Sequence, residues 1–156
     1  MSRPALTAAW LAPAALAVAL STGCAAGRDD LRTVADEPAA PFEQAMRAWA
    51  GCASRGDVDG MLALTSRTTI RTTGLQQLRA LYENDVSRAL AQSPQMSTGG
   101  EQITVIAEDG ATGWLFRRVF SSPGGDQLAL EILVLREDGQ PRVSSYRPWR
   151  LAGRPD

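Results

Sequence analysis

The cysteine at position 24 is the residue of this chain whose neighbours most clearly specify a chemistry. It follows Leu20-Ser21-Thr22-Gly23, and the last two of these side chains are small enough for a signal peptidase that cleaves directly before a cysteine. This order is typical of a bacterial lipobox. It predicts that the Cys24 sulfur forms a thioether with a diacylglyceryl group, whose two acyl chains give stable anchoring at about 0.8 kcal/mol per buried CH2.

The segment before the lipobox has the features of a secretory signal peptide. Arg3 supplies positive charge, and an apolar run rich in Ala and Leu follows over residues 5–20. This run is short for a membrane span and Pro13 interrupts it, so a permanent transmembrane helix is the weaker interpretation. We therefore expect residues 1–23 to be removed and the mature chain to be anchored outside the cytoplasm. Ala25, where an Asp would favour the inner membrane, favours the outer membrane facing the periplasm in a Gram-negative cell; in a Gram-positive cell the anchor lies on the outer face of the cell membrane.

Cys52 is the second of two cysteines, and its state depends on Cys24. If Cys24 is lipidated, Cys52 is a lone thiol in an oxidising compartment; after an ordinary cleavage the two could form a disulfide. Cys52 lies within a helical apolar pattern, which predicts burial. The alternative is a thiol sensor, which needs a lowered thiol pKa. Arg55 is the nearest cation in the sequence, but the C-terminal end of a helix disfavours a thiolate.

The composition argues against several classes of function. The 156 residues contain no His, which removes Ser-His-Asp and Cys-His catalysis and most catalytic zinc sites. All 16 basic residues are Arg, the net charge is -1, and no basic patch stands out, so nucleic-acid binding has little support. We see no glycine-rich phosphate loop or metal-ligand cluster in the sequence, and we expect neither a cofactor nor a metal.

The chain after the lipobox divides into a tether and one domain. Residues 24–41 mix charge, Ala and Pro without apolar periodicity, which indicates a flexible tether. Residues 42–150 carry the patterns of a single α+β domain, and 151–156 form a short C-terminal tail.

Helical periodicity comes first in this domain. It predicts three helices, over 42–54, 58–62 and 74–91. Asp57 is placed to cap the second helix, and Thr73 and Gln76 have the spacing of a capping box at the third. The Thr-rich segment 66–73 is predicted to be a loop or a short extended piece. The buried side of the third helix is expected to carry Leu75, Leu78, Tyr82, Val86 and Ala89.

A period of two then replaces the helical one. It predicts strands over 102–107, 112–120, 127–136 and 142–149. Asp109-Gly110 and Asp138-Gly139 are hairpin signals, so three N-terminal helices should pack on a four-stranded antiparallel meander. The third strand is apolar on both faces, which predicts a central position with helices on one side and a partner, a second copy or a ligand on the other. Trp149 is expected to close the core, with Arg147 and Arg150 in solvent.

The order of the elements and their turns resembles that of a known group of proteins. The first helix ends at Arg55-Gly56-Asp57, and the meander carries the turns Glu108-Asp109-Gly110 and Glu137-Asp138-Gly139-Gln140. In these features the chain is similar to the nuclear transport factor 2-like superfamily, also called SnoaL-like or cystatin-like cone folds, and looks like its small bacterial lipoproteins. The resemblance implies a curved sheet around long helices with a conical cavity. It implies no activity, because members include isomerases, cyclases, dehydratases and non-enzymes.

Two functions follow as hypotheses. The first is a non-enzymatic envelope lipoprotein that binds a partner protein, a second copy or an apolar ligand through the sheet or the cone cavity. The second is an isomerase or cyclase, in which a carboxylate removes a proton beside a carbonyl while a Tyr holds the oxyanion. Its candidates are Glu131 as the base and Tyr82 as the donor. Each has a structural alternative: an ion pair of Glu131 with Arg117 or Arg118 on the neighbouring strand, and core packing of Tyr82.

Overall fold

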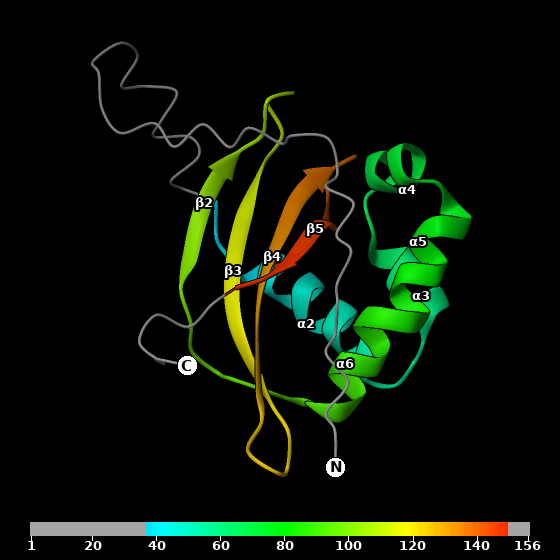
Figure 1. Ribbon diagram of the computed structural model, residues 1–156. Coiled ribbons are helices and arrows are strands. Elements are labelled where there is room, and N and C mark those ends of the chain that lie inside the picture. The colour runs from blue at the N-terminus through cyan, green and yellow to red at the C-terminus, as the bar shows by residue number, and fades with distance from the viewer. Residues whose placement is uncertain (1–36, 150–156) are drawn as a thin grey trace.

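The structure of the protein, a computed structural model, describes residues 37–149. The predictions made for the signal peptide, for Cys24 and for the tail after Trp149 lie outside these residues. Helices from the first half of the domain cover one face of a curved antiparallel sheet from the second half (Figure 1). The predicted α+β class, with N-terminal helices packed on a curved meander, is confirmed. None of the helices within residues 37–149 has the length and apolar character needed to cross a membrane.

The helical half contains more short elements than the sequence predicted. In chain order they are α2 (Ala40–Ser54), α3 (Val58–Leu64), α4 (Arg67–Thr73), α5 (Leu75–Leu81), the π-helical turn η1 (Tyr82–Val86) and α6 (Ser87–Gln92). The last three follow one another without a break and form the helix predicted over 74–91. The first helix begins at Ala40, inside the predicted tether, and Pro41 in its first turn presets the helical φ there.

The helix α4 contradicts the prediction of a loop or extended piece in this segment. The Ser66 hydroxyl accepts the Thr69 N–H at 3.3 Å, and the Glu137 carboxylate accepts the N–H groups of Arg67 at 2.8 Å and Thr68 at 3.1 Å. These bonds satisfy donors that a helix N-terminus leaves free. No residue of α4 is buried, so its sequence has no apolar stripe from which a helix could be predicted.

Of the two predicted caps, one is confirmed and one is wrong. The Asp57 carboxylate accepts the Gly60 N–H at 2.9 Å and caps α3, as predicted. The capping box between Thr73 and Gln76 does not form, because Gly74 occupies the N-cap of α5 and no side chain bonds there.

The third helix buries a slightly different face from the predicted one. Its buried apolar side chains are Leu78, Tyr82, Val86 and Leu90. Leu75 is largely exposed and Ala89 is only half-buried, so these two predictions are wrong. A series at four-residue spacing drifts by about 40° per step around an α-helix. The wider π turn at η1 takes in an extra residue and keeps the series facing the core.

The sheet is the predicted four-stranded meander with one short strand added. Its strands are β1 (Gln95–Met96), β2 (Gln102–Ile106), β3 (Thr112–Ser121), β4 (Gln127–Glu137) and β5 (Gln140–Pro148). All pair antiparallel; β1 and β2 both pair with β3, and β4 lies between β3 and β5. The chain bulges between β1 and β2, where a side chain at Gly100 would collide with the Arg117 carbonyl oxygen. The turn at Asp138-Gly139 has two positive φ values, as a tight hairpin requires.

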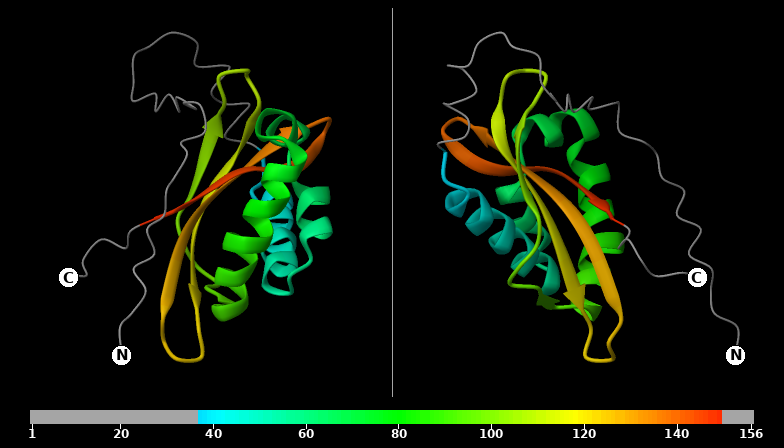
Figure 2. Two further views of the ribbon diagram at one scale, coloured as in Figure 1. Left: turned by 45° about the vertical axis from the view of Figure 1, so that its right-hand side comes forward. Right: turned by 90° about the vertical axis from the view of Figure 1, so that its left-hand side faces the viewer.

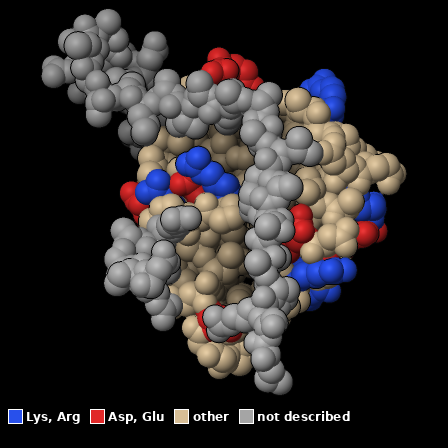
Figure 3. All heavy atoms as spheres, in the orientation of Figure 1, with Lys and Arg blue, Asp and Glu red and all other residues tan. Residues whose placement is uncertain are grey.

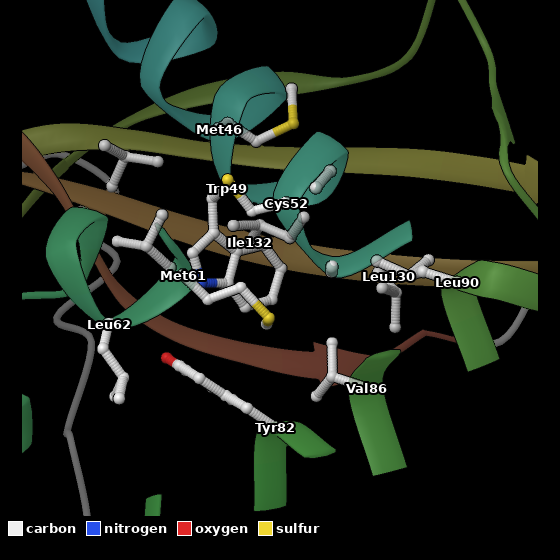
Figure 4. Close-up of a cluster of buried hydrophobic side chains, with 14 of the residues drawn as sticks. Met46, Trp49, Cys52, Met61, Leu62, Tyr82, Val86, Leu90, Leu130 and Ile132 are labelled. Carbon is white, nitrogen blue, oxygen red and sulfur yellow. The ribbon is translucent and has the colours of Figure 1, made fainter. Parts of the chain in front are cut away.

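The main core lies between the helices and one face of the sheet. Figure 2 shows the helices gathered on that side. Figure 4 shows side chains of α2, α3, η1 and α6 converging on β4. The largest fully buried side chains there include Trp49, Tyr82, Phe42 and Phe116.

Candidate functional site

The candidate site is the face of the sheet that points away from the helices, which we call the outer face. Side chains of β3 alternate as the sequence predicted. Trp114, Phe116, Arg118 and Phe120 share the helix-facing side, and Leu115, Arg117 and Val119 share the outer face. Strand β4 is central, as predicted, and it buries apolar side chains on both faces.

A second, smaller apolar cluster lies on the outer face. Its buried members are Val105 of β2 and Leu133 and Leu135 of β4, with half-buried Leu115 of β3 packed against them. No helix residue of the described chain belongs to this cluster. The outer face therefore carries its own apolar cluster, separate from the main core.

Four charged side chains cross the outer face beside this cluster. Glu101 precedes β2, Arg117 is on β3, Glu131 on β4 and Arg147 on β5, and each lies opposite the next across the strands. Arg117 lies 2.5 Å from a Glu101 oxygen and 2.8 Å from a Glu131 oxygen, and Arg147 bonds the other Glu131 oxygen. We call these four residues the charge row; Figure 3 shows red and blue side chains alternating there.

Burial within the charge row is uneven, and the buried member is an acid. The Glu131 side chain is only 4% exposed, whereas Arg147 is 74% exposed and Glu101 is 52% exposed. Burial opposes ionisation of Glu131, but hydrogen bonds from Arg147 and Arg117 outweigh it and hold its pKa below the ordinary 4.5. Hydrogen bonds to Glu131 and to Glu101 raise the pKa of Arg117, with Glu131 the larger cause. Glu131 is therefore a carboxylate held charged by two guanidinium groups.

Trp149 lies against the charge row and not in the main core. The Arg117 guanidinium carbon is 5.1 Å from the centre of the Trp149 ring, a cation–π distance. The prediction that Trp149 closes the main core is wrong, because its N–H bonds the Ala129 carbonyl oxygen and extends the β4–β5 pairing by one residue. Side chains alternate along a strand, so Trp149 shares the outer face with Arg147.

Tyr82 sits on the other side of the sheet from Glu131. Its hydroxyl is 2.9 Å from the Thr65 hydroxyl, and its ring contacts Trp49 and Tyr146 at centroid distances of 5.7 and 6.1 Å. Burial raises the pKa of Tyr82. The sheet thus separates the two residues nominated for proton transfer. The structural alternatives therefore describe both residues: Glu131 forms ion pairs, and Tyr82 packs in the main core.

The ion pair predicted for Glu131 involves Arg117 and not Arg118. Arg118 points toward the helices and is almost completely buried, with its guanidinium 3.4 Å from a Glu43 oxygen. The sequence analysis missed Arg147 as the second partner. Side-chain alternation along β5 predicts the partner of Glu131 only when the register of the strand is known. That register is irregular near Val143.

Cys52 is buried, as predicted. Burial raises the pKa of its thiol, and Asp57 adds to this effect, although Arg55 acts in the opposite direction. A reactive thiolate needs a lowered thiol pKa, and burial and Asp57 both act against this.

Within residues 37–149, no three His, Cys, Asp or Glu side chains come together in a way that could hold a metal ion. Comparisons of the chain with protein-family models, with curated proteins and with solved structures give no match.

Proposed function

We propose that the protein is a lipid-anchored binding module of the bacterial cell envelope, which uses the outer face of its sheet to hold a protein partner. The observation that carries the proposal is the two-sided burial of β4, with helices on one face and the separate apolar cluster and charge row on the other. An apolar cluster beside charged groups, with no helix of the described chain over it, is the kind of sheet face that a protein partner can use. We place the anchor at Cys24, as the lipobox predicts.

The observed contacts support a binding role over an isomerase or cyclase. A base that removes a proton beside a carbonyl needs a free lone pair near the substrate. Both carboxylate oxygens of Glu131 are engaged by arginines, and Tyr82 lies across the sheet. The resemblance to nuclear transport factor 2-like lipoproteins remains part of the proposal, and the helix-then-meander order is consistent with it.

Site-specific photo-crosslinking in the producing bacterium tests this proposal. A photoreactive amino acid replaces Leu115 on the outer face of the full-length chain, and a matched control carries it at Arg88, an exposed position of α6. We expect discrete crosslinked products from position 115 and none from position 88. Equal crosslinking from both positions, or none from either, would contradict a binding role for the outer face.

A further inference from the structure

We propose that the free edge of strand β2 pairs with the β2 edge of a second copy of this chain, so that two sheets join end to end into one. The inference concerns the border of the sheet and not its outer face, so it goes beyond the proposed function and does not rest on it. It comes from the backbone groups that β2 leaves without a partner.

Strand β2 lies at the border of the sheet and turns half of its backbone groups away from β3 (Figure 1). The Arg117 N–H bonds the Glu101 carbonyl oxygen at 2.9 Å. Because bonded pairs alternate along an antiparallel ladder, the N–H and C=O groups of Gln102, Thr104 and Ile106 point away from β3. Within residues 37–149, β2 has no second strand partner, so these groups face outward unpaired.

The opposite edge of the sheet, at β5, is protected. The Ser66 N–H bonds the Val143 carbonyl oxygen at 2.8 Å, and the Thr69 hydroxyl bonds the Ser144 carbonyl oxygen at 2.7 Å. Pro148 removes a donor further along the same strand. Covering segments, prolines, bulges and charged side chains are the usual protection of a free edge. Strand β2 carries no charge and no proline, and it pairs with β3 in continuous register, so it is the edge left open to a further strand.

Two antiparallel copies of β2 match in the register centred on Thr104. Gln102 then pairs with Ile106 of the second copy and Thr104 with the same residue, and each pair exchanges two hydrogen bonds. Like charges do not meet, because the paired segment has none and Glu101 falls opposite Ala107 of the second copy. Ile106 is 44% exposed in the single chain, and the pairing covers it.

The segment before β2 leaves room for the turn of the second copy. In the same register, Glu108 and Asp109 of the second copy lie beside Gly100 and Gly99. A Cβ added at Gly99 would meet no atom within 4 Å. The neighbouring turn therefore meets small residues with open space beside them.

The pairing also suits two chains anchored in one membrane. The described chain starts at Glu37, which bonds Thr112, and Thr112 lies opposite Ile106 at the end of β2. In the joined sheet the two copies of Ile106 lie about 14 Å apart along the strands. The predicted tether of residues 24–36 spans about 20 Å as a coil, so both anchors can enter the same membrane. Anchoring raises the local concentration of an edge pairing that is weak in solution.

Engineered cysteines at two exposed positions test the register. Gln102→Cys and Ile106→Cys are made separately in full-length chains that also carry Cys52→Ser, and the two chains bear different tags. They are coexpressed in the producing bacterium, and disulfide-linked products are separated by mass without reductant. We expect a product of twice the chain mass with both tags. It should exceed the product of either variant alone by about tenfold or more, because identical positions lie beyond the roughly 7 Å that a disulfide can bridge.

A change at the centre of the register tests the cause of the pairing. Thr104→Pro, made in both chains, removes an N–H that faces the free edge and keeps the bonds to β3, so the mixed product should disappear. Thr104→Arg is the second variant if Thr104→Pro fails to fold, because it opposes two like charges at the axis. Gln140→Arg, at an exposed position of the protected β5 edge, is the matched control and should leave the mixed product unchanged.

The results separate this inference from the proposed function. A mixed product that is weak in either variant alone and lost with the change at Thr104 supports the edge pairing. No mixed product, equal products from all samples, or a mixed product that survives the change at Thr104 overturns it. Crosslinks from position 115 report on the outer face, so they support or contradict the binding role whether or not the edges pair.

Discussion

Glu131 shows how the environment of one residue decides between two chemistries. A carboxylate on a central strand suggests a base, but here two guanidinium groups bond its two oxygens. Removing one partner of a buried ion pair is costly, because it leaves the other charge without compensation. Glu131 therefore contributes to the cohesion of β3, β4 and β5, and its contribution should depend on pH.

The sign of that pH dependence follows from the lowered pKa. Because the folded protein holds the pKa of Glu131 below the ordinary 4.5, its ionisation stabilises the fold above that pH, and the stabilisation is lost as the pH falls through the folded value. We expect Glu131→Gln to lower the free energy of unfolding by about 1–3 kcal/mol at neutral pH. Urea unfolding at a series of pH values should show this deficit shrinking in acid.

The matched control for Glu131→Gln is Glu108→Gln, which changes an exposed carboxylate in the turn between β2 and β3. It should leave the free energy of unfolding nearly unchanged at every pH. A deficit in Glu131→Gln that stays constant as the pH falls would mean that shape, and not charge, makes this residue important.

At the scale of elements, the accuracy of prediction depended on where the stabilising contacts lie in the sequence. Helix α2 and the strands were found because their apolar side chains repeat within the segment itself. Helix α4 was missed because its N-terminus is bonded by Glu137, about 70 positions away, and because it buries no side chain. The face of the third helix was misplaced because no local pattern announces the π turn at η1.

The candidate site was partly predictable for the same reason. Alternation along β3 and β4 identified the outer face and the partner Arg117. Arg147 and Glu101 could not be assigned, because their positions depend on the irregular register of β5 and on the bulge before β2.

The contact of Glu137 with α4 gives a prediction at this scale. The carboxylate accepts two backbone N–H groups, which also lower the pKa of Glu137 against the opposing effect of burial. Glu137→Ala should free these donors and cost about 1 kcal/mol, as the loss of a helix cap does. Hydrogen exchange should show that the amides of residues 67–73 exchange faster in the variant than in the unchanged chain, while the amides of α2 exchange at the same rate in both. Asp138→Asn is the control, because its pair with Arg67 is exposed and Asn tolerates the positive φ. Unchanged exchange in Glu137→Ala would show that Ser66 alone sustains the helix.

At the scale of the whole molecule, the two faces of the sheet have separate roles. The helix-facing side holds the main core and maintains the fold, so changes to its side chains should act through stability. The outer face carries a smaller cluster and exposed charges, so under the proposed function changes at the exposed Glu101 should act on partner binding and leave the fold intact. Under the proposed function, this separation would let the binding face vary without loss of the domain.

The lipid anchor proposed at Cys24 can be tested with a matched pair of cysteine variants. Cys24→Ser removes the sulfur that the lipobox presents for acylation, so we expect the chain to move from the membrane fraction to the soluble envelope fraction and to lose incorporation of labelled fatty acid. Cys52→Ser changes a buried thiol and should leave both properties intact. In the proposed lipoprotein two acyl chains would supply the membrane affinity, so the shift on loss of Cys24 should be nearly complete. Membrane retention of Cys24→Ser without a fatty-acid label would show that contacts of the folded domain, and not a lipid, hold the protein at the envelope.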